Sequence, residues 1–139
     1  MSSDKLTPEA RSALMAKVRS KNTAPEIRVR RAAHAIGLRF RLSRRDLPGS
    51  PDLVLPRYRL AVFVHGCFWH RHPDCRRASV PATRPEFWEM KFAKNVARDL
   101  AATAALHDRG WKTLVIWECE TKCDAHIQQA LRDAIAQNS

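Results

Sequence analysis

Several features are missing from this sequence, and each absence argues against a class of protein. No apolar run approaches the roughly 20 residues of a membrane-spanning helix, and the N-terminus has no apolar signal-peptide stretch. We therefore expect a cytoplasmic protein without a membrane partner. The four cysteines include no Cys-x-x-Cys pair, which argues against a thiol redox enzyme. In a cytoplasmic chain, such cysteines favour metal binding over disulfides.

Acidic residues are also scarce. The chain has 14 Asp and Glu against 25 Lys and Arg, which gives a formal net charge of +11. A domain this basic usually binds a polyanion, most often nucleic acid. The excess lies in the first 60 residues, whose net charge is +9 against +2 for the rest. With 139 residues, 45% of them hydrophobic, we expect one domain over 1–139. Its N-terminal part would be the main surface for the polyanion.

Capping and periodicity predict an α/β fold in which helices flank a mixed sheet. Two of the predicted helices open with the capping-box pattern Thr-x-x-Glu. The third helix has an apolar face with i, i+4 spacing, formed by Phe92, Val96, Leu100 and Ala104. The predicted helices are Pro8–Arg19, Thr23–Gly37, Thr83–Asp108 and Asp124–Ala136, and the predicted strands are Leu38–Leu42, Asp52–Leu55, Leu60–Val64 and Trp111–Trp117.

Residues 65–75 combine three histidines, two cysteines and two adjacent aromatics directly after an apolar strand. If the strand ending at Trp117 runs beside residues 60–64, Cys119 comes next to Cys67. A closed tetrahedral zinc site would result, and it would be structural because it has no open position. Its ligands would be Cys67, His72, Cys75 and Cys119. A set of four cysteines, with Cys123 in place of His72, is the alternative.

Asp52 is the main acid–base candidate. It begins a strand that a short connection joins to the next, so a hairpin would bring it near the Val64 carbonyl and His65. Carboxylate and carbonyl oxygens suit Mg²⁺, which keeps several waters and meets phosphate oxygens. A nearby histidine, His70 or His65, could take a proton from an attacking water. This arrangement predicts metal-assisted phosphodiester hydrolysis.

A wider pattern extends from about Arg19 to Cys119. It comprises Pro51-Asp52, residues 62–70, residues 80–88, Lys94-Asn95, Arg98-Asp99, Gly110-Trp111 and residues 115–119. These segments resemble the very-short-patch repair (Vsr) DNA mismatch endonucleases. The resemblance implies a restriction-endonuclease-like core with a structural zinc site. It also implies a bacterial, magnesium-dependent enzyme that nicks one strand 5′ to the thymine of a T·G mismatch left by deamination of 5-methylcytosine.

The resemblance assigns roles to individual residues. Asp52 and the Val64 carbonyl would hold magnesium, and Val64 stands where the best-studied relatives have threonine. His70 would be the general base and His65 a second active-site histidine. Glu26 would contribute to catalysis, although its place in a capping box is a sufficient structural reason for a glutamate.

The resemblance also assigns DNA contacts and metal ligands. Phe68, Trp69 and Trp88 would wedge into the duplex beside the mismatch, and core packing is the alternative for them. Cys67, His72, Cys75 and Cys119 match the family's structural zinc ligands.

The basic N-terminal arm, residues 1–22, is a further expected DNA contact, through Lys17, Arg19 and Lys21. The expected partner is duplex DNA with a T·G mismatch, bound by a monomer. Mismatch-repair proteins are further expected partners. Two other functions stay open. One is a nickase or restriction-type enzyme of the same fold with a different or relaxed target. The other is a zinc-stabilised DNA-binding module without catalysis.

Overall fold

The protein is described from a computed structural model, which covers residues 23–42 and 44–136. The predicted helix at Pro8–Arg19 and the arm with Lys17, Arg19 and Lys21 lie outside these residues. The helices are α2 (Ala24–Ala35), α3 (Pro85–Asp108) and α4 (Asp124–Ala136), and the strands are β1 (Leu53–Leu55), β2 (Leu60–His65) and β3 (Lys112–Trp117). No helix in these ranges is both long and apolar enough to cross a membrane.

The sheet is mixed, in the order β1-β2-β3. β1 and β2 form the predicted antiparallel hairpin, in which Leu55 lies opposite Leu60. β3 runs parallel to β2 and ends with Trp117 beside His65. The expectation of a mixed sheet flanked by helices is therefore confirmed. The register also places the ends of β2 and β3 side by side, so the segments that follow them start from neighbouring positions.

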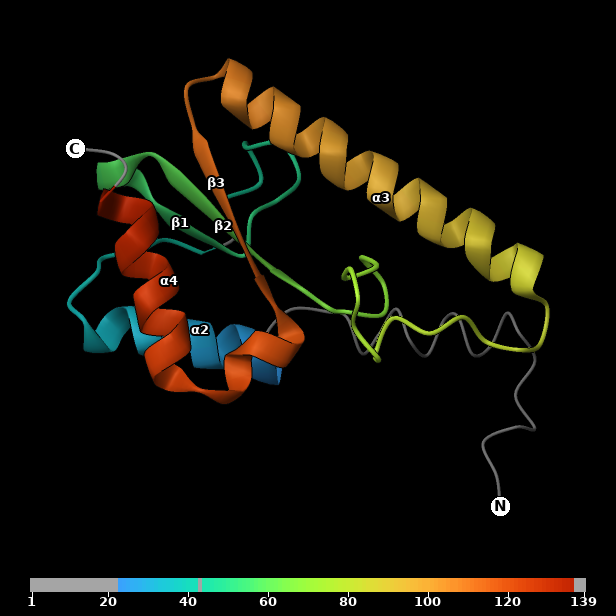
Figure 1. Cartoon of the computed structure of the whole chain (residues 1–139). Coiled ribbons are helices and arrows are strands. Elements are labelled where there is room, and N and C mark those ends of the chain that lie inside the picture. The colour runs from blue at the N-terminus through green and yellow to red at the C-terminus, as the bar shows by residue number, and fades with distance from the viewer. Residues whose placement is uncertain (1–22, 43, 137–139) are drawn as a thin grey trace.

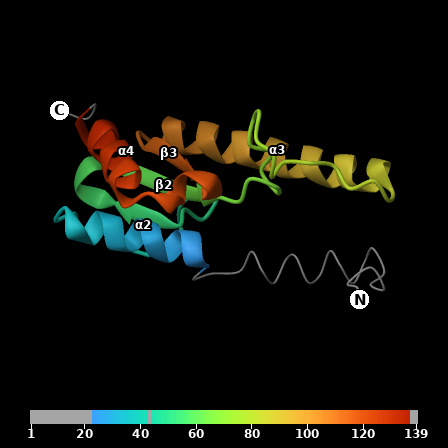
Figure 2. The ribbon, with the colours of Figure 1, turned by 60° about the horizontal axis from the view of Figure 1, so that its bottom comes forward.

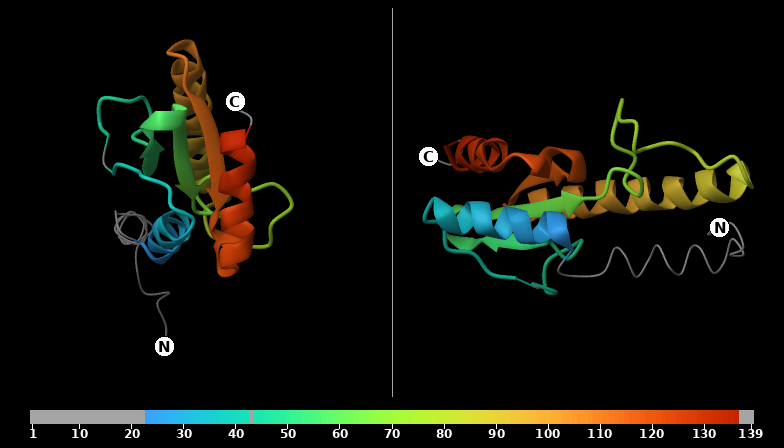
Figure 3. Two further views of the ribbon diagram at one scale, coloured as in Figure 1. Left: turned by 90° about the vertical axis from the view of Figure 1, so that its left-hand side faces the viewer. Right: turned by 90° about the horizontal axis from the view of Figure 1, so that it is seen from below.

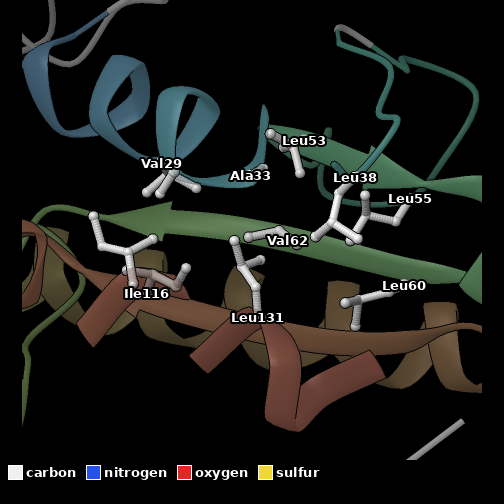
Figure 4. Packing of buried hydrophobic residues seen from close by; sticks show 11 residues of the cluster. Val29, Ala33, Leu38, Leu53, Leu55, Leu60, Val62, Ile116 and Leu131 are labelled. Atoms are coloured by element: carbon white, nitrogen blue, oxygen red, sulfur yellow. The ribbon is translucent and has the colours of Figure 1, made fainter. Parts of the chain in front are cut away.

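Both faces of the central strand are covered, as Figures 1 and 3 show. Alternate residues of a strand point to opposite faces. Leu60 and Val62 therefore pack with α2 and α4 in the larger core, and Figure 4 shows Val62 facing this layer. Ala61 and Phe63 pack with Leu106 of α3 on the other face. The same alternation places His65 on the α3 side, where its ring lies 5.7 Å from that of Phe63.

Helix α3 extends past the end of the sheet, and residues 66–84 run beside this extension (Figure 2). Its inward face differs from the predicted one, because Leu100 is 67% exposed and Ala104 is exposed as well. The buried residues are Trp88, Phe92, Asn95 and Leu106. Polar residues interrupt this inward face, because they contact the segment after β2. A search for a continuous apolar pattern therefore does not identify the face.

The strand predicted at Leu38–Leu42 does not form. Only Arg41 pairs with the sheet, through two 2.9 Å backbone hydrogen bonds with Val54. β1 has only three residues, so a segment beside this edge can form little more than one bridge with it. The alternation of apolar and basic residues at 38–42 reflects instead a segment that buries Leu38 and exposes its arginines.

Gly49 lets the loop before β1 approach α3 closely. Its φ is +77°, and a Cβ atom there would lie 2.6 Å from the Ala102 Cβ and 3.2 Å from the Phe63 ring. Gly37 also has a positive φ, of +80°, but a Cβ atom there would meet nothing within 4 Å. An alanine at Gly37 would therefore add backbone strain alone, whereas an alanine at Gly49 would add backbone strain and steric overlap.

We predict that Gly37→Ala lowers the free energy of unfolding by about 1–2 kcal/mol, the cost of a left-handed alanine. Gly49→Ala should cost roughly 1–3 kcal/mol more, because the loop and α3 must also move apart. Urea unfolding of both variants measures the difference. Equal losses would show that the loop is not packed against Ala102 as described.

Candidate active site and metal centre

A cleft of about 770 Å³ lies at the end of β2. The N-terminal turn of α2, the loop before β1 and the segment after β2 form its walls. Four of the predicted catalytic residues line it, namely Glu26, Asp52, His65 and His70, together with Val64. The fold therefore brings together residues that lie up to 44 positions apart in the chain.

Asp52 is held against β2 by both its backbone and its side chain. Its N–H donates to the Val62 carbonyl at 3.0 Å, and its Oδ2 accepts the Val64 N–H at 2.6 Å. In an extended strand the N–H and C=O of one residue point to the same side. The Val64 carbonyl therefore faces the side on which Asp52 lies. A carboxylate and a carbonyl on one side of a strand fit the oxygen ligands that Mg²⁺ requires.

The pKa of Asp52 is raised from 3.8 to about 6. Burial is the main cause, because it disfavours the charged form. The Val64 N–H lowers the pKa, the negative charge of Glu26 raises it and the positive charge of Arg30 lowers it. Asp52 is itself half buried. A partly buried carboxyl with an elevated pKa in a cleft is typical of a functional group, and a bound cation would favour its ionised form.

His65 and His70 stack, with ring centroids 3.9 Å apart and planes 7° from parallel. His70 Nδ1 lies 2.6 Å from Oδ2 of Asp99 on α3. A carboxylate at Nδ1 retains the proton on that nitrogen, which leaves Nε2 with the lone pair. Asp99 thus holds His70 in the orientation that a general base would need, in the way that a carboxylate orients the histidine of other hydrolases.

Asp99 is the site residue that the sequence analysis missed as a functional group. It lies one helical turn after Asn95, whose Nδ2 donates to the Trp69 carbonyl at 3.4 Å. Two polar residues one turn apart on the inward face of α3 were the available signal. That signal depends on knowing the inward face, which the apolar pattern predicted wrongly.

The predicted cysteine–histidine group is gathered at the ends of β2 and β3. The possible ligand atoms of Cys67, His72, Cys75 and Cys119 all lie within 4.8 Å of one another. His72 Nδ1 is 3.7 Å from the Cys67 Sγ and 3.4 Å from the Cys119 Sγ. A tetrahedral zinc ion with ordinary bond lengths would separate such atoms by about 3.6 Å. The group therefore fits a closed metal site.

Cys123, the alternative fourth ligand, is exposed and lies outside this group. Cys123 follows a 3-10 turn, Glu118–Lys122, and stands immediately before α4. His72 instead stacks on Trp117, with ring centroids 4.3 Å apart. The structure therefore favours the Cys₃His set over the four-cysteine set.

The thiols of this group differ in their environments. Burial raises the pKa of Cys67 to about 12, whereas hydrogen bonds, first that of the Arg77 backbone, lower the pKa of Cys75 to about 7. A coordinated thiol is deprotonated outright, so a metal ion would override the effect of burial on Cys67. Glu118 supports the site from outside, because its Oε1 accepts the Cys67 N–H at 3.4 Å.

The predicted DNA wedges form an aromatic cluster with α3. Trp69 and Trp88 are 4% and 3% exposed, and they pack with Phe92. Phe68 is only half buried, and it lines the cleft. In this arrangement Phe68 is the aromatic side chain best placed to reach DNA. Trp69 also lines the cleft, but it is almost wholly buried. Trp88 lies behind it and packs in the cluster.

Glu26 serves the helix and the cleft together. Its Oε2 accepts the Thr23 hydroxyl at 2.7 Å and the Thr23 N–H at 3.3 Å, as the capping box requires. Its Oε1 lies 3.6 Å from an Arg30 nitrogen. Its charge is close enough to raise the pKa of Asp52. The capping role is therefore satisfied, and it does not exclude a contribution to the site.

The raised pKa of Asp52 predicts a cost in stability at neutral pH. The carboxyl stabilises the fold in its protonated form below pH 3.8, and this contribution is lost as the pH rises through about 6. Asp52→Asn removes the ionisation. In Mg²⁺-free buffer, the variant's advantage in unfolding free energy over the native protein should therefore grow by roughly 2–3 kcal/mol between pH 4 and pH 8. Urea unfolding across this range measures it, and a constant difference would contradict the buried carboxyl.

The chain is similar to known proteins of one family. A family model described as DNA mismatch endonuclease Vsr matches residues 3–77. The chain is 49% identical to the Type II nicking enzyme V.XorIIP of Xanthomonas oryzae pv. oryzae, over 95% of this chain and 96% of that protein. It is 39% identical to the Type II nicking enzyme V.NmeAIP of Neisseria meningitidis, over 92% of this chain and 91% of that protein.

A further relative is the DNA mismatch endonuclease Vsr of Escherichia coli (strain K12). It is 45% identical over 109 residues, which cover 78% of this chain and 69% of that protein. The family model spans more than half of the chain, and it includes Asp52, His65 and His70. The chain belongs to the DNA mismatch endonuclease Vsr family, and it is an endonuclease that hydrolyses phosphodiester bonds in DNA.

Proposed function

We propose that this endonuclease nicks one strand of duplex DNA 5′ to the thymine of a T·G mismatch, using magnesium. The observation that carries the proposal is the meeting of Asp52, His65 and the His70–Asp99 pair in one cleft. This is the group of side chains that hydrolysis of a phosphodiester needs: a carboxylate for a cation and an oriented base. The nick would begin the repair of deaminated 5-methylcytosine in the bacterial cytoplasm.

His70 is the general base in this proposal. With Nδ1 directed to Asp99, its Nε2 takes a proton from a water molecule as the water oxygen attacks phosphorus. The bond from phosphorus to the 3′ oxygen breaks, and that oxygen takes a proton from solvent water, which leaves a 3′-hydroxyl and a 5′-phosphate. His65 supports the His70 ring by stacking. Glu26 adds negative charge beside Asp52, which would strengthen the site's hold on a cation.

Two metal ions have separate places in the proposal. Asp52 and the Val64 carbonyl would hold Mg²⁺, which would neutralise charge that develops on the phosphate. Cys67, His72, Cys75 and Cys119 would hold a structural Zn²⁺, which fixes the segment that carries His70.

Mismatch recognition would come from the edge of the aromatic cluster. A wobble pair is poorly stacked, so an apolar wedge can part it from its neighbour at a cost of a few kcal/mol. Phe68 lines the cleft and is the first wedge in this proposal, with Trp69 and Trp88 behind it. The arm 1–22, with Lys17, Arg19 and Lys21, would hold the duplex beside a single domain that acts as a monomer.

A second candidate is a nicking enzyme of the same fold with a different or relaxed target. Relatives at 49% and 39% identity carry the name Type II nicking enzyme, which favours this alternative. Mismatch-repair proteins are further partners in this proposal. A DNA-binding module without catalysis is not supported, because the family is one of endonucleases.

We predict that Asp52→Ala, His70→Ala and Asp99→Asn each lower the single-turnover nicking rate by about 10²–10⁴-fold. The first removes the carboxylate for the cation, and the other two remove the general base or its support. Binding of a T·G duplex should change little, because these side chains act on the reacting phosphate. His126→Ala, at an exposed position on α4, is the matched control and should retain activity.

The same assay tests the target. Duplexes with T·G, with other mismatches and with matched pairs are compared with and without Mg²⁺. The proposal predicts one nick, 5′ to thymine, on the T·G duplex alone and only with Mg²⁺. Equal nicking of matched duplexes would favour the second candidate, and native activity in His70→Ala would reject the assigned base.

A further inference from the structure

The charge of the cleft is opposite to that of the chain. Although the protein has a formal net charge of +11, the cleft lining includes four carboxyl groups, those of Glu26, Asp52, Asp99 and Glu118. Among the described residues that line it, only one is a lysine or arginine, and that residue is Arg77. A phosphodiester entering the cleft therefore meets mostly negative charge, which repels it. A positively charged side chain on the wall would offset this repulsion.

Arg77 is placed at the open side of this wall. Its Nη1 lies 3.4 Å from Glu118 Oε2, and its side chain is 43% exposed. The other oxygen of Glu118 accepts the Cys67 N–H, so Glu118 is fixed to the start of the segment after β2. An exposed ion pair contributes little to stability, because water screens it. Holding the fold together is therefore a weak explanation for this arginine.

A guanidinium has five N–H donors, and its planar arrangement matches two oxygens of a phosphate. The contact with Glu118 uses one edge of the group and leaves donors that can face the cleft. Glu118 thus holds the arginine in position without occupying it fully.

We propose that Arg77 is a substrate-binding residue that contacts the non-bridging oxygens of the scissile phosphate or of its neighbour. Glu118 positions it by tying it to the Cys67 backbone. This inference rests on the proposed function of the cleft, and it adds the group that offsets the charge of the four carboxylates before and during nicking.

The adjacent residue provides a matched control. Arg76 is exposed, carries the same charge and lies outside the cleft lining. Arg77→Gln and Arg76→Gln therefore make the same change in charge one position apart. The Arg77 backbone, which hydrogen-bonds Cys75, is unaffected by the substitution. Arg77→Lys retains the charge but loses the paired donors.

The experiment measures binding and single-turnover nicking of a T·G duplex in which single phosphates near the nick are replaced by uncharged methylphosphonates. Arg77→Gln should weaken binding about tenfold and lower the salt dependence by about one phosphate contact. Arg76→Gln should change neither by more than twofold, and Arg77→Lys should recover only part of the loss. At one methylphosphonate position, and at no other, native protein and Arg77→Gln should bind equally.

Zinc content and the midpoint of thermal unfolding should be the same in all four proteins. Equal effects of Arg76→Gln and Arg77→Gln would overturn the assignment, as would a loss of binding by Arg77→Gln that no methylphosphonate removes. Failure of the proposed function looks different, because the native protein itself would then bind or nick without regard to the mismatch.

Discussion

The site depends on how the chain is held immediately after β2. Residues 66–75 leave the sheet beside the end of β3, and they are fixed from two sides. Cys119, just after β3, meets Cys67 and His72 on one side. Asp99 of α3 meets His70 on the other. One segment thereby carries two histidines with different partners, because His72 lies against thiols and His70 against a carboxylate.

This arrangement explains why metal-ligating and catalytic residues are interleaved. His70 and His72 are two positions apart, and each is committed to a different partner. If the cysteine group holds zinc, the ion fixes the backbone on which His70 stands, and Asp99 only has to set the orientation of the ring. The mostly acidic cleft inside a basic chain follows the same division, because the cation site needs carboxylates while the surrounding surface meets DNA.

The sequence predicted those features that depend on local rules. The capping box at Thr23 and the hairpin between β1 and β2 formed as expected, because they need only neighbouring residues. The second predicted capping box, at Thr83, did not form, because α3 begins after Arg84, which has a left-handed backbone and no side-chain cap. The meeting of Cys119 with Cys67 followed from one further assumption, a parallel β3. Each of these features depends on few residues, and each has few structural alternatives.

The remaining features depend on packing between distant segments. Leu100 continued an apolar stripe but is exposed, because Asn95 and Asp99 take the inward face of α3 to meet Trp69 and His70. The burial of Trp69 depends on Trp88 and Phe92 of α3, and no local pattern indicates this contact between separate segments. Arg41 forms one bridge instead of a strand because β1 ends too soon.

The central claim is that the cysteine–histidine group supports the catalytic segment. The most direct measurement is the zinc content of the protein together with its rate of nicking a T·G duplex in Mg²⁺. It is made for native protein, Cys119→Ser and Cys123→Ser. The account predicts one zinc and full activity in native protein and Cys123→Ser, and loss of both in Cys119→Ser. Full nicking by a zinc-free Cys119→Ser protein would contradict it.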